Sequence, residues 1–194
     1  MGNLTDHFAS SGGGNNILEE IVFHPKGQTI TTIKGDFTAG NITTHQDFTT
    51  STMTLVTGSE IPYIPPDGTT SVYLKYEFAC RKAGASGTQL GSVAFELGTS
   101  AVGWTDIWDS RSQWFHNQNT YEVNRKSIEC IISINGTEDI EQGSLSSWDS
   151  ERIIRVRAAT YSATHSYRMH RLDYWRNAST DSFVRPTITI IAMK

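Results

Sequence analysis

Three carboxylates in the middle of the chain, Glu96, Asp106 and Asp109, are the residues from which a glycosidase site could be built. Glycoside hydrolysis needs two carboxyl groups held at a fixed separation on either side of the scissile bond. Asp106 and Asp109 are three residues apart in an irregular polar stretch, and this spacing fixes no separation. We therefore keep a sugar-active enzyme only as the last alternative and predict that the protein is not an enzyme.

Histidines are the second group with chemical potential, because imidazole and carboxylate side chains bind metal ions. The residues of this type that could gather around one metal ion are His116, His165, His170 and Asp173. His165 and His170 are five residues apart, so on one strand their side chains would point to opposite faces. We expect no metal site within one chain. The alternative of a metal site on a threefold axis, with one His or Asp from each of three subunits, stays open.

Motifs for nucleophilic and nucleotide chemistry are missing from the sequence. It has no G-x-S-x-G elbow, no phosphate-binding loop and no dinucleotide fingerprint. The glycines Gly12-Gly13-Gly14 follow no strand pattern and precede no lysine, so they do not form a phosphate cradle. We expect no cofactor.

Aromatic side chains give the strongest indication of binding. Trp104, Trp108, Trp114 and Trp175 fall in loops or at strand ends, near Asp, Asn and Arg residues. Such aromatic planes bind sugar rings, anchor protein interfaces, or close the ends of a sandwich, and the sequence leaves these three interpretations open. With Tyr73, which faces outward from a predicted strand, they form our set of candidate interface or ligand-contact residues.

These residues need a β scaffold, and the stretch Ile61–Cys80 predicts its central strand. Prolines and an Asp-Gly turn precede a segment in which apolar and mostly polar residues alternate. Alternation places the two sets on opposite faces, as in an antiparallel strand with one face in a core. The apolar set is Val72, Leu74, Tyr76, Phe78 and Cys80, and the other set is Tyr73, Lys75, Glu77 and Ala79.

Further alternating runs predict about eight strands from Ile61 onward, the spacing of an all-β sandwich. The last run is apolar enough that it would be an aggregation hazard at an open edge, so we expect it to be paired inside a sheet. We also expect a hairpin of Ile17–Phe23 and Thr29–Ile33 through the turn at 24–27, and a hairpin turn at Asn135-Gly136. The main runs are 93–97, 121–134, 152–160, 165–172 and 183–191.

Three segments follow from these patterns. Residues 1–16 end in a Ser/Gly/Asn tract and predict a flexible N-terminal arm. Residues 17–57 predict a hairpin and short strands that are either the first part of the sandwich or a small layer against it. Residues 58–194 predict an antiparallel, jelly-roll-like β-sandwich domain.

Composition and charge limit the kinds of partner that we expect for this protein. The 194 residues have a net charge of −4, with 37% hydrophobic and 19% charged residues. There is no basic stripe for phosphates, so we expect no nucleic acid. There is no apolar run of membrane-spanning length and no apolar leader, so we expect no membrane insertion and folding in the cytoplasm. Cys80 and Cys130 lie on apolar faces, which favours buried free thiols over a disulfide.

The order of several segments resembles a family of small virion structural proteins of tailed bacteriophages, especially phages of aquatic bacteria. The resemblance covers roughly residues 55–194, and its most specific parts are Tyr63-x-Pro-Pro-x-Gly68 and the Arg185-Pro186 segment near the end. The aromatic strand is also similar to trimeric jelly rolls of the complement and tumour-necrosis-factor type. The segments are PYIPPDGTTSVYLKYEFAC, W-x3-W, SIECIISING, SLSSWDSERIIRVRAATYS, LDYW and FVRPTITIIAMK.

The resemblance implies a protein that is placed in many copies on a particle. We expect a homotrimeric decoration protein on a phage capsid, made in the cytoplasm of the host bacterium and attached to the major capsid protein or another virion protein. The alternative is a tail fibre or receptor-binding protein that contacts a host surface glycan or receptor. The short chain, without a fibrous or coiled-coil shaft, weighs against this alternative.

Overall fold

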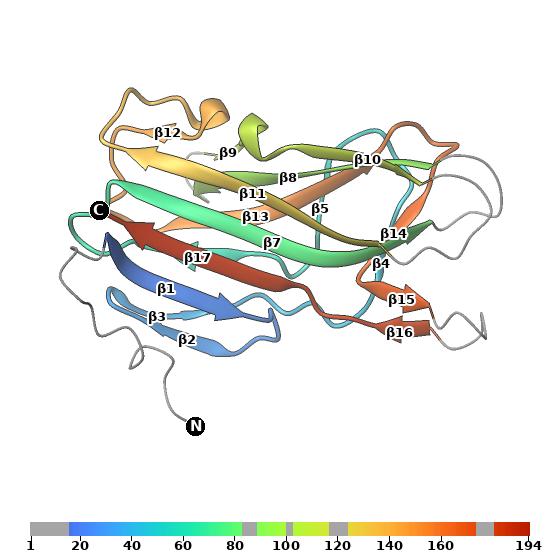
Figure 1. The fold of residues 1–194 in the computed structure, drawn as a ribbon, viewed down its shortest axis with the longest axis horizontal. Coiled ribbons are helices and arrows are strands. Elements are labelled where there is room, and N and C mark those ends of the chain that lie inside the picture. Colours follow the sequence, from blue (N-terminus) through green and yellow to red (C-terminus); the bar gives the residue numbers. More distant parts are fainter. Residues whose placement is uncertain (1–15, 83–88, 100–102, 117–123, 174–180) are drawn as a thin grey trace.

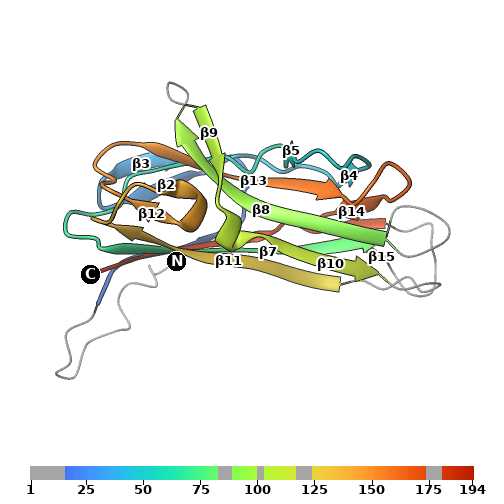
Figure 2. The same ribbon diagram turned by 90° about the horizontal axis from the view of Figure 1, so that it is seen from above.

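The computed structural model describes residues 16–82, 89–99, 103–116, 124–173 and 181–194. Within these ranges the chain forms two packed β-sheets, drawn along the shortest axis of the molecule in Figure 1 and from above in Figure 2. The predicted all-β, jelly-roll-like sandwich is confirmed. No helix among the described residues is long and apolar enough to span a membrane.

The first sheet contains the strand that the sequence places at the centre. Its strands are β1 (Ile17–Phe23), β17 (Thr187–Met193), β7 (Ser71–Lys82), β11 (Asn124–Ile134) and β12 (Ser144–Leu145), in that order, with β14 (Tyr167–Met169) on β7 and β4 (Gln46–Phe48) on β14.

The second sheet packs against the inner face of the first. Its strands are β10 (Ser112–His116), β8 (Gln89–Thr99), β13 (Arg152–Thr160) and β5 (Thr54–Leu55), with β6 (Ile61–Tyr63) on β13 and β9 (Gly103–Asp106) on β8. Two ribbons and two short 3-10 helices complete the described chain: β2 (Thr29–Thr32) with β3 (Gly35–Thr38), β15 (Arg171–Asp173) with β16 (Asp181–Phe183), η2 (Trp108–Ser110) and η3 (Ile140–Gln142).

The connectivity is that of a jelly roll. Eight strands in chain order are β1, β6, β7, β8, β10, β11, β13 and β17. One sheet contains β1, β17, β7 and β11, which are the first, eighth, third and sixth of these strands. The other sheet contains β6, β13, β8 and β10, which are the second, seventh, fourth and fifth. Neighbours within each set of four pair antiparallel, so the chain crosses repeatedly between two sheets, as in double-sheet jelly rolls.

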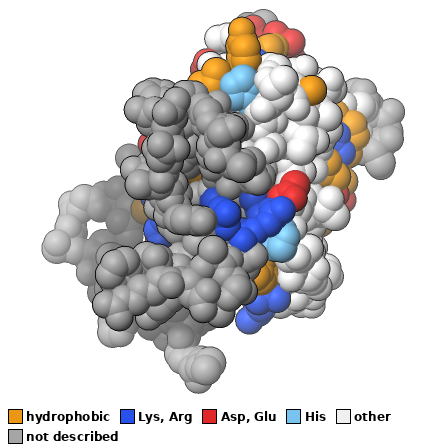
Figure 3. Space-filling view, turned by 90° about the vertical axis from the view of Figure 1, so that its right-hand side faces the viewer, with side chains coloured by type: hydrophobic (Ala, Val, Ile, Leu, Met, Phe, Trp, Pro, Cys, Tyr) orange, Lys and Arg blue, Asp and Glu red, His pale blue; other side chains and the backbone are white. Residues whose placement is uncertain are grey.

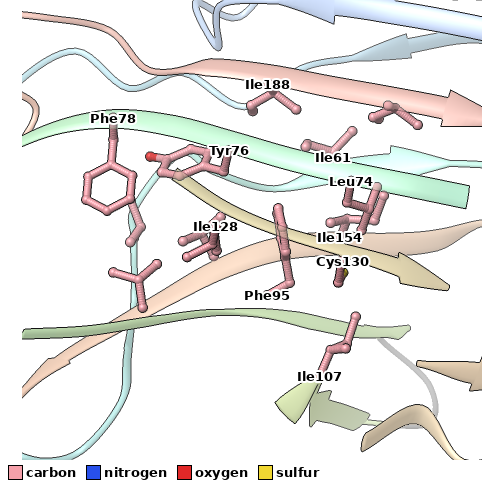
Figure 4. Close-up of a cluster of buried hydrophobic side chains, with 14 of the residues drawn as sticks. Ile61, Leu74, Tyr76, Phe78, Phe95, Ile107, Ile128, Cys130, Ile154 and Ile188 are labelled. Carbon is pink, nitrogen blue, oxygen red and sulfur yellow. The ribbon is translucent and has the colours of Figure 1, made fainter. Parts of the chain in front are cut away.

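The core follows the alternation of β7. Leu74, Tyr76 and Phe78 point inward and are almost fully buried, whereas Tyr73, Lys75 and Glu77 lie on the other face. Figure 4 shows the inward set together with Phe95 of β8 and Ile154 of β13 from the opposite sheet. Each fully buried apolar side chain of this size contributes roughly 1.5–3 kcal/mol relative to exposure. Ala79, expected on the polar face, is also buried.

The N-terminal hairpin prediction is wrong. β1 pairs with β17, from Phe23 opposite Ile188 to Ile17 opposite Met193, and β2 pairs with β3 instead. Composition identified a turn between the first two runs but could not identify the partner of each strand. Pairing with β17 lets β1 bury Ile21 and Phe23 in the core. Strands from residues 17–57 therefore enter both sheets, through β1, β4 and β5.

The hairpin turn at Asn135-Gly136 is also corrected. Asn135 has the left-handed φ of 74° that such turns use. The chain then passes through η3 and returns as β12, which pairs parallel to β11. The last strand, β17, is paired inside a sheet as predicted, and its neighbours are β1 and β7. Pro186 precedes it where no ladder donor is needed.

Candidate interaction surface

The outer face of the first sheet carries an apolar row across three strands. The register places Ile131 of β11 and Ile191 of β17 on either side of Tyr73 of β7. Ile131 is 55% exposed, and the other two side chains are half-buried. Directly opposite residues share a face and contact one another. We call Ile131, Tyr73 and Ile191 the apolar row.

Tyr73 is held in place on this face. Its hydroxyl donates a hydrogen bond to a Glu129 carboxylate oxygen over 2.5 Å. Partial desolvation and this bond raise the pKa of Tyr73 to about 12, so the phenol stays neutral near pH 7. The hydroxyl is therefore used within the chain, and the ring remains as contact area for a partner.

Charged residues lie beside the apolar row. The Lys75 ammonium is 3.2 Å from a Glu77 carboxylate oxygen, and Glu129 lies opposite Lys75 in the register. An apolar centre with a polar surround is the usual composition of a protein interface. Tyr73 thus lies on the outer face, as predicted, and the surface around it has the composition of a protein interface.

Trp104 lies on the second sheet, on strand β9, which stands out from the side of the sandwich in Figure 2. The Arg155 guanidinium carbon is 3.4 Å from the centre of a Trp104 ring. This contact is a cation–π interaction, which strengthens when the pair is partly desolvated. Arg155 is mostly buried, so Trp104 covers an arginine rather than standing free.

Under this arginine lies a buried carboxylate. Glu96 is 2% exposed and accepts hydrogen bonds from Arg155 Nε and, at 3.1 Å, from Arg157 Nη1. The same Arg157 nitrogen is 3.2 Å from Asp106. A buried charge persists only when it is paired in this way. The structure thus brings Glu96 and Asp106 together through Arg157, while Asp109 is exposed on η2.

Trp108 is the most accessible of the described candidate tryptophans. It is 46% exposed, and the Arg111 guanidinium carbon is 5.0 Å from its ring centre. The underlying η2 turn is fixed by Ser110, whose hydroxyl donates to Ile107 O at 2.6 Å and accepts from Phe95 N at 2.8 Å. Within the stretch predicted to be irregular, η2 is therefore an ordered turn that displays an aromatic ring, and strands β9 and β10 lie on either side of it.

Trp114 does not belong to the surface, which corrects its place among the contact residues. It is 7% exposed and packs at 5.3 Å from Tyr167 and 5.6 Å from Phe78 between ring centres. Pairing of β10 with β8 turns its side chain inward. A Cβ on Gly91 would lie 2.8 Å from the indole, so the glycine provides the space for Trp114. Trp175 lies outside the described residues.

Tyr76 and His170 form a buried polar pair that the sequence does not predict. The Tyr76 hydroxyl is 2.6 Å from His170 Nε2, and both side chains are fully buried. Burial lowers the pKa of His170 to about 3, so the imidazole is neutral. The backbone of His170 has a left-handed φ of 63°, which is uncommon for a residue other than glycine.

Metal and thiol chemistry find little support in the described part of the chain. No group of three potential metal ligands occurs there. His165 is half-buried beside Ser162, and the side chains of His116 and Asp173 are outside the description. Cys80 and Cys130 are free and buried, as predicted, and desolvation raises the pKa of both thiols to about 12.

Comparison with known proteins gives distant likenesses only. No family model matches the sequence, and no curated protein matches it. A structure of infectious bursal disease virus, strain Gx, aligns with a TM-score of 0.38 and 10% identity, over 91% of this chain and 37% of that chain. A structure of the Gt strain aligns with a TM-score of 0.28 and 11% identity, over 86% and 43% of the two chains. This chain thus spans less than half of each viral chain.

Proposed function

We propose that the protein is a non-enzymatic structural protein of a bacteriophage virion, a homotrimer that decorates the capsid surface. The observation that carries the proposal is the apolar row on the outer face of the first sheet. In a single chain this row has no covering element among the described residues. Exposed apolar surface with a polar surround marks a site of protein association.

A closed ring of three copies would bury the apolar row of every copy. An interface that repeats head to tail closes into a ring when its rotation permits. The similarity of the aromatic strand to trimeric jelly rolls supports three copies, and the resemblance to small phage virion proteins supports a particle as the location. Attachment to the capsid protein is assigned to the predicted arm, residues 1–16, of which only Asn16 is described.

The test is the mass of the protein in solution, measured by light scattering behind a sizing column. The wild type should elute as three copies. The change I131E places a charge in the centre of the apolar row and should yield monomers. I33E is the matched control, because Ile33 is 64% exposed and outside the row. A monomeric wild type, or an I131E protein that stays trimeric, would contradict the proposed interface.

Receptor binding is the second candidate function, and the exposed Trp108 favours it. An indole on an ordered turn next to Arg111 offers a stacking surface and hydrogen-bond donors to a sugar. If the protein is a tail fibre or receptor-binding protein, it should bind host cells, and W108A should lose that binding. Decoration predicts instead that a fused tag appears over the head of the assembled particle, which electron microscopy can locate.

A further inference from the structure

A hollow of about 160 Å³ opens on the first sheet where β17 leaves β7. β17 pairs with β7 only as far as Thr187 opposite Glu77, whereas β11 continues to pair along β7 up to Cys80. The described lining residues are Glu77, Phe78 and Ala79 of β7, Arg125, Lys126 and Ser127 of β11, and Val184, Arg185 and Thr187 at the start of β17.

The fold keeps this hollow open. The backbone N–H of Val184 donates to His170 O at 2.9 Å, and the ring Nδ1 of His24 is 2.8 Å from Pro186 O. These contacts fix the segment before β17 away from the β7 ladder. Ala79 lies opposite Arg125 in the register, and its small side chain leaves the space that a larger residue would fill.

The charge in the hollow is predominantly positive. Two cations, Arg125 and Arg185, meet one carboxylate, Glu77, which already has the Lys75 ammonium at 3.2 Å. Lys126 lies opposite the inward Phe78 in the register, so its side chain belongs to the inner face of the sheet. Arg125 and Arg185 make no ion pair or side-chain hydrogen bond with any residue that the structure describes, although the Arg185 guanidinium lies 5.2 Å from the Phe183 ring. Figure 3 views the right-hand end of the molecule as drawn in Figure 1, and several Lys and Arg side chains gather on that visible surface.

We propose that this hollow binds an oxyanionic group, held by Arg125 and Arg185. A guanidinium presents paired N–H donors that match the oxygens of carboxylates, phosphates and sulfates. Two such groups, together with the hydroxyl-bearing Ser127 and Thr187 in the same wall, provide more hydrogen-bond donors than the described part of the chain uses. The site lies four residues along β7 from Tyr73, so it is separate from the apolar row.

The test uses two probes, inorganic phosphate and glucuronate, titrated by calorimetry at constant ionic strength because salt screens exposed charges. At least one probe should bind the wild type. R125Q/R185Q should bind it at least about tenfold more weakly, the loss expected when charged hydrogen bonds are removed. K26Q/K194Q removes two exposed charges elsewhere and should bind like the wild type.

The outcomes separate the sources of the anion. Binding of phosphate alone assigns the site to phosphate-like esters, and binding of glucuronate alone assigns it to carboxylates. Thermal unfolding checks that the double variant is folded, and R185Q alone replaces it if it is not. The proposal is overturned if neither probe binds, or if the arginine variant binds as tightly as K26Q/K194Q.

Discussion

Tyr76 and His170 form a polar contact of 2.6 Å inside the protein, where both side chains are fully buried. Tyr76 lies on the central strand β7, and His170 lies at the corner between β14 and β15. The backbone of His170 donates to Ala79 O at 2.7 Å and accepts from Val184 N at 2.9 Å. The pair thus connects the centre of the sandwich to the corner that positions the chain before β17.

Removing the Tyr76 hydroxyl should destabilise the fold. Y76F leaves His170 Nε2 buried without a partner, and an unsatisfied buried polar group costs about 1–3 kcal/mol. Urea unfolding measures the change, with Y161F as the control because Tyr161 is 71% exposed. Equal unfolding midpoints for the two variants would show that the hydroxyl contributes nothing.

The pH dependence of stability should report on His170. Folded His170 stays neutral down to about pH 3, whereas the unfolded chain protonates it below its ordinary pKa of 6.5. Between these values the unfolded state binds more protons, so the free energy of unfolding falls as the pH drops through 6.5. One proton corresponds to a slope of about 1.4 kcal/mol per pH unit.

The variant H170N removes this titration and tolerates the left-handed φ of the position. We expect the free energy of unfolding of H170N to depend less steeply on pH than that of the wild type between about pH 6 and pH 4. The difference in slope should correspond to about one proton. H165Q serves as the control for removal of a histidine elsewhere. The same slope in H170N and the wild type would contradict the assignment.

Glu96 should be essential to the second sheet. E96A would leave Arg155 and Arg157 without their shared carboxylate under Trp104. Breaking a buried pair costs about 3–5 kcal/mol, and we expect roughly 2–4 kcal/mol here because both arginines keep some contact with water. The exposed Glu141 gives a control, E141A, that should unfold at the wild-type urea concentration.

Gly91 and Trp114 should be coupled. In G91A the new Cβ would lie 2.8 Å from the indole and 3.0 Å from Tyr167, which predicts a loss of about 1–3 kcal/mol from overpacking. W114F in the same chain provides a smaller ring and should recover part of that loss. A double-mutant cycle measures the coupling, and additive effects would argue against the contact.

The thiols of Cys80 and Cys130 should be inert in the folded protein. Both are buried with pKa values of about 12, so the reactive thiolate is scarce at pH 8. A colorimetric thiol reagent should detect neither cysteine in native protein and both after unfolding in urea. Rapid labelling of the native protein would place at least one thiol at an opening of the core.

The sequence predicts those features that depend on neighbours along the chain. The alternation in β7 identified its buried face, and the apolar 183–191 run identified an interior strand. Pairing between distant strands cannot be seen in local patterns, which is why β1 was given the wrong partner. Trp114 was misplaced because its inward orientation depends on the register of β10 with β8 and on space left by Gly91. The burial of His170 and its contact with Tyr76 cannot be predicted from the sequence, because they arise where three segments meet.

The pairing of β1 with β17 leaves the two ends of the sandwich adjacent. Lys194 N donates to Asn16 O at 2.6 Å. Once residues 1–15 are removed, a few added residues should therefore join these positions into a circular chain, and new ends could then be opened at an exposed turn elsewhere. A peptide fused at either position would emerge from the same corner, which makes this corner suitable for displaying cargo.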